Sequence, residues 1–598
     1  MRTTHSRESE DQSTLSRRDF LKYGGVAVGG AAATAALAAC GDSDSDGDGA
    51  PATTAAPGTT APGEPAAIDR DLIVAQPDLW TSLDHLFDRT SQESTANLGG
   101  RLFVYDYDGV NPIITDLENT LVGELAEGLE INADKTQYTI TLKQGVLSHH
   151  GNEMTSEDVV YSYARGVAAD RSFGLDGFLH SIASQITDAE QVKALDDYTV
   201  QITLERPFPT FLHHFALPFT GNIHDSETMR ENSTNDDPWS EEWKKNNTEG
   251  FGPYMLEDFT QGTEAIWVAN PNYVLYDVPI KRVIWRVVPV SATRLSLIES
   301  GDVHVANAML VREQVQAQQA GLSLPNAVSS FSQWTWYPLD VPPWSHPLVR
   351  RAYTHVIPYD DIIDIVYQGK ARREFGPVWE PGGVPYAHTE LFERYYRTDP
   401  DESRRLLEEA GFPDGVSSEL WYNETIPDQE EMCVLIRDTA AEGGWDLSIV
   451  GKTTAAIQEA RIDPLTVGGA GAPANLFKDQ IIVPDIFYQV ALLPPFGARF
   501  CTPDSVIGGA SCELVFDDFT EEQILLYEEG LRNALESGDW DSPAATAGWE
   551  QSLRAVADGS PLSFYLWFDP ASIHDPRLTG WEYRIENATD YSRLSWTS

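Results

Sequence analysis

Apolar and polar positions alternate strictly in two stretches of the chain and follow a helical period in others. In residues 138–142 and 198–204 every second side chain is apolar, as in a half-buried strand. A helix is predicted after Thr155, because a threonine hydroxyl accepts a free backbone N–H and the acids Glu157 and Asp158 suit the positive end of a helix dipole. The interspersed strands and helices, without an internal repeat, predict a mixed α/β protein with sheets flanked by helices.

Glycine and proline mark further helix ends. Residues 291–300 have a helical pattern that stops at Gly301, and a second helix opens at Pro400 and stops at Gly411. A third helix is predicted over residues 429–441. These helices lie far apart along the chain, which favours an α/β organisation throughout.

The first forty residues have the pattern of a targeting signal. Arg17 and Arg18 precede a Gly- and Ala-rich apolar run, residues 24–39, which is followed by Cys40. The run is shorter than the roughly 20 residues that a bilayer needs, which disfavours a transmembrane helix. The pattern resembles a twin-arginine signal that ends in a lipoprotein processing site. Residues 1–39 are therefore predicted to be removed after export and Cys40 to be lipidated.

Residues 40–67 have the composition of a linker between the predicted lipid anchor and the rest of the chain. After the cysteine they contain Asp, Ser and Gly, then Thr, Ala, Pro and Gly, without a large apolar side chain. Such a segment cannot bury enough surface to offset its ordering entropy, so a disordered linker is predicted, with a reach on the order of 30 Å. The expected location is extracytoplasmic and lipid-anchored, in the periplasmic space or at the outer face of the plasma membrane.

The charge of the chain is strongly negative, with 41 Lys and Arg against 92 Asp and Glu. Removal of residues 1–39 leaves 36 basic and 88 acidic side chains and a net charge of −52. This surface repels nucleic acid and anionic lipid, so neither is an expected partner, and membrane contact is expected through the lipid anchor only. Residues 68–598 are too many for one hydrophobic core and predict two or three lobes.

Three cysteines follow Cys40 in the sequence. Cys501 and Cys512 flank a Gly-rich stretch and are predicted to form a disulfide in an oxidising compartment. Cys433 falls in the predicted helix 429–441 and is interpreted as a buried free thiol.

Motifs for catalysis and metal binding are weak or missing. The sequence has no phosphate-binding loop, no His-Glu-x-x-His, no Cys-x-x-Cys and no Gly-x-Ser-x-Gly. The Gly-rich residues 469–474 lack a preceding strand and are interpreted as a loop. His149, His150, His213 and His214 are candidate metal ligands, but a structural role is the favoured interpretation. Neither a metal nor a cofactor is expected.

An ordered series of segments resembles the family 5 extracellular solute-binding proteins of ABC importers, which include oligopeptide-, dipeptide- and nickel-binding proteins. Their order and spacing carry this resemblance more than any single motif does. The segments are residues 121–130, 138–146, 149–160, 195–200, 250–254, 270–273, 293–302, 348–352 and 406–413.

The resemblance implies a type II periplasmic-binding-protein-like α/β fold, with two lobes around a cleft and an extra inserted subdomain. Mapped onto this chain, it places lobe I at residues 68–97, 217–310 and 541–598, the inserted subdomain at 98–216, and lobe II at 311–540. It also implies a monomer that closes around a solute by a hinge motion and delivers it to an ABC permease and ATPase complex, without catalysis.

The resemblance further implies that the ligand is a peptide, although the aspartate that pairs with a peptide ammonium in relatives has no counterpart at the expected place. Asp485 is a substitute candidate, and a ligand gripped by stacking and shape is the other possibility. A sugar-oligomer or metal-chelate binder of the same family, and a cofactor enzyme exported by the twin-arginine route, are the alternatives. The candidate ligand-binding residues are Trp80, Ser82, Trp334, Trp336, Trp379, Tyr422, Asn423, Asp485 and Tyr488.

The alternation of side chains along one predicted strand distinguishes two faces among these candidates. In residues 333–337, Trp334 and Trp336 share one face of a strand, while Thr335 and Tyr337 share the other. If the strand borders the cleft, one pair faces ligand and the other faces the core.

Overall fold

The computed structural model describes residues in eighteen ranges of one compact unit, Pro65–Ser598. The segments predicted as signal peptide and linker, with Arg17, Arg18 and Cys40, lie outside them. No helix in these ranges combines the length and apolar character needed to cross a membrane. The ranges are residues 70–86, 92–105, 121–170, 185–208, 211–218, 220–324, 331–338, 341–376, 390–426, 428–453, 456–457, 474–480, 521–536, 542–560, 562–568, 572–581, 583–584 and 588–597.

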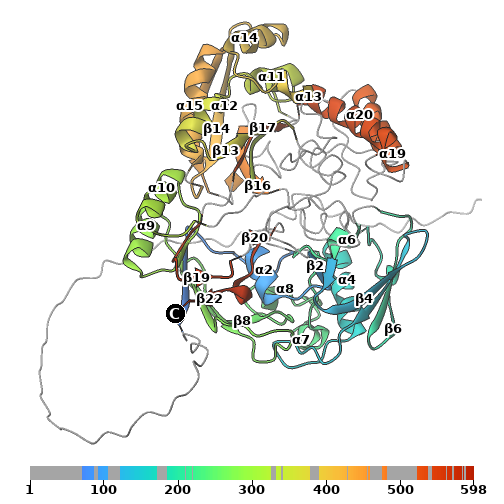
Figure 1. Cartoon of the computed structure of the whole chain (residues 1–598). Coiled ribbons are helices and arrows are strands. Elements are labelled where there is room, and N and C mark those ends of the chain that lie inside the picture. The colour runs from blue at the N-terminus through green and yellow to red at the C-terminus, as the bar shows by residue number, and fades with distance from the viewer. Residues whose placement is uncertain are drawn as a thin grey trace, which may run out of the picture. The chain divides into compact units, whose positions relative to one another are not determined.

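A six-stranded sheet forms the centre of lobe I (Figure 1). Its central strand β1 runs parallel to β10 and β11, and the other neighbours are antiparallel. Fully buried Trp267 and Trp285 fill its core with Tyr254. In spatial order the strands are β18 (Ile573–His574), β11 (Val305–Ala306), β1 (Leu72–Gln76), β10 (Arg282–Val287), β9 (Glu264–Ala269) and β8 (Tyr254–Thr260).

The inserted subdomain contains a four-stranded antiparallel sheet, on which α4 (Ser156–Asp170) packs along β6 and β7. The strands predicted over residues 138–142 and 198–204 are confirmed as β5 and β7. Helix α4 begins directly after Thr155, whose backbone N–H donates to Asp158 Oδ2 at 2.7 Å, so the acid rather than the threonine hydroxyl caps this turn. The sheet order is β4 (Ala126–Ile131), β5 (Gln137–Leu142), β7 (Thr199–Thr203) and β6 (Val192–Asp196).

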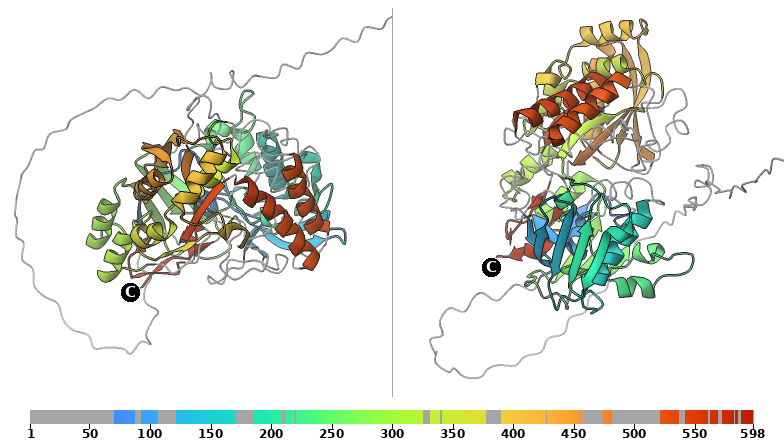
Figure 2. Two further views of the ribbon diagram at one scale, coloured as in Figure 1. Left: turned by 90° about the horizontal axis from the view of Figure 1, so that it is seen from above. Right: turned by 90° about the vertical axis from the view of Figure 1, so that its right-hand side faces the viewer.

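Lobe II is built on a second six-stranded sheet. Strand β12 is antiparallel to β16 and β17, whereas β14 is parallel to β15 and β16. Helices α19 and α20 lie side by side (Figure 2). The strands are, in order, β13 (Ala371–Arg373), β17 (Leu562–Phe568), β12 (Phe331–Trp336), β16 (Ala474–Gln480), β14 (Val416–Asn423) and β15 (Trp445–Lys452).

The predicted helices 291–300, 400–410 and 429–441 are confirmed as α9, α14 and α15. Gly301 ends α9 with a φ of 80°, a conformation that glycine adopts without strain. Asp399 caps α14 by accepting from the backbone N–H of Glu402 at 3.1 Å. The helices of lobe II are α11 (Pro347–Thr354), α12 (Tyr359–Asp361), the π-helical turn η3 (Ile362–Val366), α13 (Glu390–Glu393), α14 (Pro400–Glu409), α15 (Gln429–Glu442), α19 (Glu521–Glu536) and α20 (Pro543–Gly559).

Short elements complete the described chain. Outside lobe II the helices are α2 (Gln92–Leu98), η2 (Ala189–Gln191), α6 (Phe211–His214), α7 (Ser226–Glu231), α8 (Glu241–Lys244), α9 (Ser291–Ser300), α10 (Val311–Gln319) and η6 (Tyr591–Arg593). The paired short strands are β2 (Phe103–Tyr105) with β3 (Leu121–Gly123), β19 (Leu578–Thr579) with β22 (Ser595–Trp596), and β20 (Tyr583–Arg584) with β21 (Ala588–Thr589).

Strand pairing corrects two predicted lobe boundaries. Residues 311–324 belong with lobe I, because Ala317 lies in its core and Ser323 pairs with His574. Strand β17 pairs with β12, so residues 542–568 belong with lobe II. The boundaries predicted after residues 310 and 540 are therefore both too early, since pairing between distant segments decides them.

Candidate ligand-binding site

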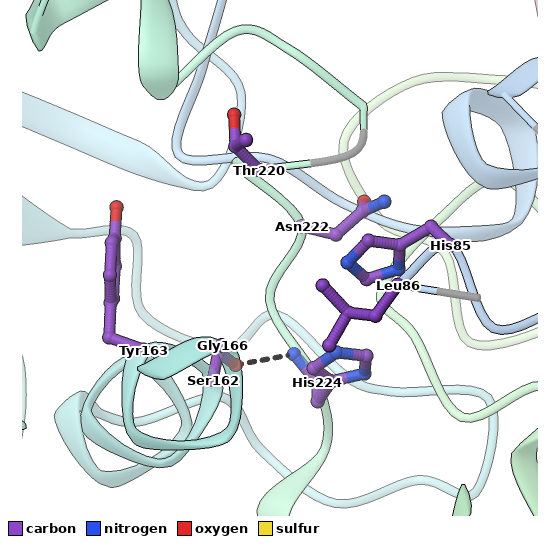
Figure 3. Close-up of a pocket in the computed structure, with 8 residues that line it drawn as sticks. All are labelled: His85, Leu86, Ser162, Tyr163, Gly166, Thr220, Asn222 and His224. Carbon is purple, nitrogen blue, oxygen red and sulfur yellow. Dashed lines mark hydrogen bonds between the residues drawn. The ribbon is translucent and has the colours of Figure 1, made fainter. Parts of the chain in front are cut away.

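Two small cavities share the lining residues His85, Asn222 and His224. The first of them, shown in Figure 3, lies between lobe I and helix α4 of the inserted subdomain. The volumes of the two cavities are about 10 and 20 Å³. Each holds about one water molecule, so neither accommodates a peptide. The rings of His85 and His224 stack with centroids 5.4 Å apart, and the backbone N–H of His224 donates to Ser162 Oγ at 2.8 Å.

Buried ion pairs surround these cavities. Glu249 forms an ion pair with Lys244, with Nζ and Oε2 2.7 Å apart, and its Oε1 bonds to His224 Nδ1 at 2.5 Å. Burial alone would raise the pKa of Glu249, but Lys244 and His224 hold it well below its usual range. Burial lowers the pKa of both His85 and His224, which favours the neutral form of both imidazoles. The negative charge of Glu249 is therefore balanced by the positive charge of Lys244, which indicates a structural cluster.

Three of the four histidines considered as metal ligands have other partners, whereas both ring nitrogens of buried His149 have no hydrogen-bond partner among the described residues. His213 Nδ1 lies 2.7 Å from the Tyr105 hydroxyl, and His150 Nε2 lies 3.1 Å from the backbone oxygen of Thr248. His214 Nε2 lies 2.9 Å from the hydroxyl of Tyr163. Within the described ranges, no three His, Cys, Asp or Glu residues come together as a metal-binding group.

Trp80 and Ser82, two of the predicted ligand residues, lie inside lobe I. The indole of Trp80 is 3% exposed and packs against Trp267 and Trp285, with ring centroids 5.6 and 5.8 Å away. Ser82 Oγ accepts from the backbone N–H of Asp84 at 3.0 Å. These placements give both residues structural contacts and offer no support for a ligand contact at Trp80.

Strand β12 places Trp334 and Trp336 on one face and Thr335, followed by Tyr337, on the other, as the sequence predicts. Thr335 bonds to the hydroxyl of Tyr565 and Tyr337 bonds to Ser563, and neither Thr335 nor Tyr337 is exposed. On the other face, Trp334 and Trp336 keep 5% and 8% of their surface exposed. Both faces therefore pack in the core of lobe II, and the tryptophan face, the less completely buried of the two, stays the candidate ligand face.

Tyr422 and Asn423 lie at the end of β14 and are half-buried. Asn423 Oδ1 accepts from the backbone N–H and the hydroxyl of Thr425 at 3.0 and 2.8 Å. The backbone N–H of Asn423 donates to Gln429 Oε1 at 2.8 Å. Gln429 Nε2 then donates to Gln333 Oε1 at 3.1 Å. Asn423 thus shapes the turn that joins β14 to α15.

This polar network is not predicted by the sequence pattern. It continues from Gln333, whose Nε2 lies 3.5 Å from the hydroxyl of Tyr367, and that hydroxyl donates to Asp428. Gln333 and Gln429 are fully buried. The one sequence signal was a glutamine beside the tryptophans of a buried strand, because a buried amide requires partners.

The remaining candidates are divided between the described and undescribed parts of the chain. Cys433 is a buried free thiol, as predicted, and burial raises its pKa above the ordinary value. Trp379, Asp485, Tyr488 and the predicted disulfide of Cys501 with Cys512 lie outside the described residues.

Two sheets of this topology, each flanked by helices, define the two-lobed α/β fold of type II periplasmic binding proteins. The chain belongs to the bacterial extracellular solute-binding proteins, family 5, because the model of that family's middle region matches residues 120–468, more than half of the chain.

Individual relatives support this assignment. The glutathione-binding protein GsiB of Salmonella typhimurium is 28% identical over 360 residues, which cover 60% of this chain and 64% of that protein. The match thus spans less than two thirds of the Salmonella protein.

Solved structures share the fold. DppA from Helicobacter pylori, in complex with the peptide STSA, is 20% identical with a TM-score of 0.70, and the match covers 88% of this chain and 98% of that one. MoaA from A. tumefacien R10, in complex with mannopinic acid, is 21% identical with a TM-score of 0.68, over 88% and 99% of the two chains.

Proposed function

We propose that this chain is the solute-binding component of an ABC importer, which captures a peptide outside the cytoplasm and delivers it to a membrane permease. The observation that carries the proposal is the family 5 match over residues 120–468. In this function, binding energy stabilises a closed form of the two lobes, and no covalent bond changes. The protein would act as a monomer and would not be an enzyme.

A peptide is the proposed solute because DppA, a protein of the same fold, holds one. Trp334, Trp336 and Tyr422 are the proposed stacking residues, with Asn423, Trp379, Asp485 and Tyr488 as further candidates. Aromatic side chains provide large contact areas and suit a ligand gripped by shape. The second candidate is an opine-like or other non-peptide solute, which the mannopinic acid bound to MoaA favours.

The proposed location is extracytoplasmic, with Cys40 as a lipid anchor and residues 41–67 as a linker to the globular part. Twin-arginine export through Arg17 and Arg18 would deliver the chain folded. Cys501 and Cys512 would then form their disulfide after export.

Identification of the natural ligand tests the proposal. The protein is purified under native conditions, denatured, and the released small molecules are analysed by mass spectrometry. A peptide supports the proposed function. A sugar oligomer or metal chelate would replace the peptide with another family solute, and a tightly bound redox cofactor would instead support the exported-enzyme alternative.

A further inference from the structure

Glu374 is a buried carboxyl group in lobe II without a counter-charge among the residues that the structure describes. It follows strand β13 directly, and its backbone N–H donates to the backbone oxygen of Tyr565 at 3.2 Å. The side chain has no exposed surface. One carboxyl oxygen, Oε2, accepts from the hydroxyl of Ser332. The other oxygen, Oε1, is buried and has no hydrogen-bond partner among the described residues.

The neighbouring cations do not neutralise Glu374. Arg373 pairs with Asp360 at 3.2 Å, and its guanidinium lies over the ring of Tyr359 at 4.1 Å. Arg372 is exposed. Burial raises the pKa of Glu374 well above its usual range, and among the described residues only the hydrogen bond from Ser332 acts to lower it.

Sheet register places Glu374 on the tryptophan side of β12. On neighbouring strands, Trp567 pairs with Arg372 on one side and with Ser332 on the other, so these three side chains lie on one face of the sheet. Glu374, two residues after Arg372, and Trp334, two residues after Ser332, lie on that same face. The pairing of β12 with β17 shifts between Gln333 and Trp334, which is a β-bulge. Bulges often re-aim side chains beside functional sites.

We propose that Glu374 is a specificity-determining residue that receives a cationic group of the bound solute, beside the aromatic face of Trp334 and Trp336. The inference rests on the proposed function and deepens it. Buried polar groups are normally hydrogen-bonded, and a carboxylate without a partner is costly. An ammonium or guanidinium group on the solute supplies both the missing hydrogen bond and the missing charge.

This role links binding to a proton. In the free protein burial favours the protonated form of Glu374, because no cation among the described residues stabilises the carboxylate. When a cationic solute binds, the carboxyl ionises and its proton passes to the buffer, while the solute keeps its own charge. Binding of a free-amine peptide therefore releases a proton, and binding of the acetylated peptide does not.

Calorimetry with matched peptides tests the proposal. The probes are tetra-alanine with a free amino terminus and the same peptide N-acetylated, each titrated in two buffers of different ionisation enthalpy. We expect the wild-type protein to bind the free-amine peptide at least about tenfold more tightly and to release a proton. In Glu374→Gln, both the preference and the proton release should disappear, while binding of the acetylated peptide persists.

Two further variants control the result. Glu93→Gln changes another acid with a raised pKa, about 7, which bonds to the Tyr591 hydroxyl at 3.0 Å in lobe I, and it should leave the preference intact. Ser332→Ala removes the one hydrogen bond to Glu374 and should weaken the preference without removing it. If Glu374→Gln does not fold, an unchanged preference in Ser332→Ala overturns the inference.

The outcomes separate the inference from the proposed function. A folded Glu374→Gln protein that keeps the free-amine preference and the proton release overturns the role of Glu374 and leaves the peptide function standing. If the folded variant binds both peptides more weakly by the same factor, the role of Glu374 is also overturned, because cation recognition concerns only the free amine. A wild-type protein that binds neither peptide contradicts the peptide function itself, and the inference with it.

Discussion

Arg165 and Asp84 form an ion pair that is almost completely withdrawn from water. Arg165 Nη1 donates to Asp84 Oδ1 at 3.1 Å, and the two residues are 1% and 0% exposed. Burial alone would raise the pKa of Asp84, but the guanidinium of Arg165 holds it below its ordinary value. The pair joins helix α4 of the inserted subdomain to the first segment of lobe I.

Breaking this pair should destabilise the protein strongly. Arg165→Leu leaves Asp84 charged and buried without its partner, and such a loss costs about 3–5 kcal/mol of the free energy of unfolding. Denaturant unfolding followed by circular dichroism measures it. The control is Arg405→Ala, which removes an exposed pair with Glu409 at 2.8 Å and should have a much smaller effect. Equal effects of the two substitutions would contradict the prediction.

Stability should fall in mild acid because of His149. Burial lowers its pKa from 6.5 to about 4 in the folded protein. Between these values the unfolded chain binds a proton that the folded chain does not, so stability is lost as the pH decreases through this window and levels off below it. A shift of this size corresponds to about 3 kcal/mol. His149→Gln should flatten the pH dependence of urea unfolding, and parallel curves for variant and wild type would refute this.

The tryptophan face of β12 should contribute to solute binding. Trp336→Ala and Tyr422→Ala should each weaken binding by more than about 1 kcal/mol if these rings are anchors. Calorimetry with tetra-alanine or the copurified solute measures the change. Trp80→Ala is the matched control, because its ring lies in the lobe I core and its loss should lower stability, with affinity unchanged in the folded fraction. Unchanged affinity in both anchor variants would exclude the assignment.

Thiol counting tests the predicted disulfide. In a Cys40→Ser protein exported to an oxidising compartment and then denatured, we expect one reactive thiol without reductant and three with it, since Cys433 is free and Cys501 would be paired with Cys512. In the native protein Cys433 should be unreactive, because it is fully buried and its pKa is raised. Three thiols without reductant would rule the disulfide out.

The anchor and the export route are testable in cells. Cys40→Ser should move the protein from the membrane fraction to the soluble extracytoplasmic fraction, because a lipid chain is the only proposed membrane contact. Replacement of both Arg17 and Arg18 by lysine should retain the unprocessed precursor in the cytoplasm. Membrane association that persists in Cys40→Ser would contradict the anchor.

Local signals predicted the secondary structure well where a pattern was complete. Residues 138–142 alternate strictly and form β5, and the helix predicted over residues 429–441 is observed as Gln429–Glu442. The lobe boundaries were harder, because β12 and β17 pair across more than two hundred residues. Pairing at that distance leaves no local trace in composition or turn residues.

In the candidate site, too, the sequence predicted local features but not the contacts between distant segments. Strand parity correctly placed Trp334 and Trp336 on one face and Thr335 and Tyr337 on the other. It could not show that Trp80 joins a tryptophan cluster, since aromatic side chains serve cores and binding sites equally well. Gln333 and Gln429 were missed because their roles depend on partners from other segments.

The sequence by itself determined the net negative charge, the α/β class and the resemblance to family 5, and it predicts an export signal and a lipid anchor, because each is a matter of composition, short motifs or local periodicity. Only the tertiary structure decided which polar residues are compensated. Asp84 meets Arg165 from 81 positions away, whereas Glu374 meets a single hydroxyl, that of Ser332, from 42 positions away. Burial and charge pairing are properties of the packed chain, so they emerge only once distant segments come together.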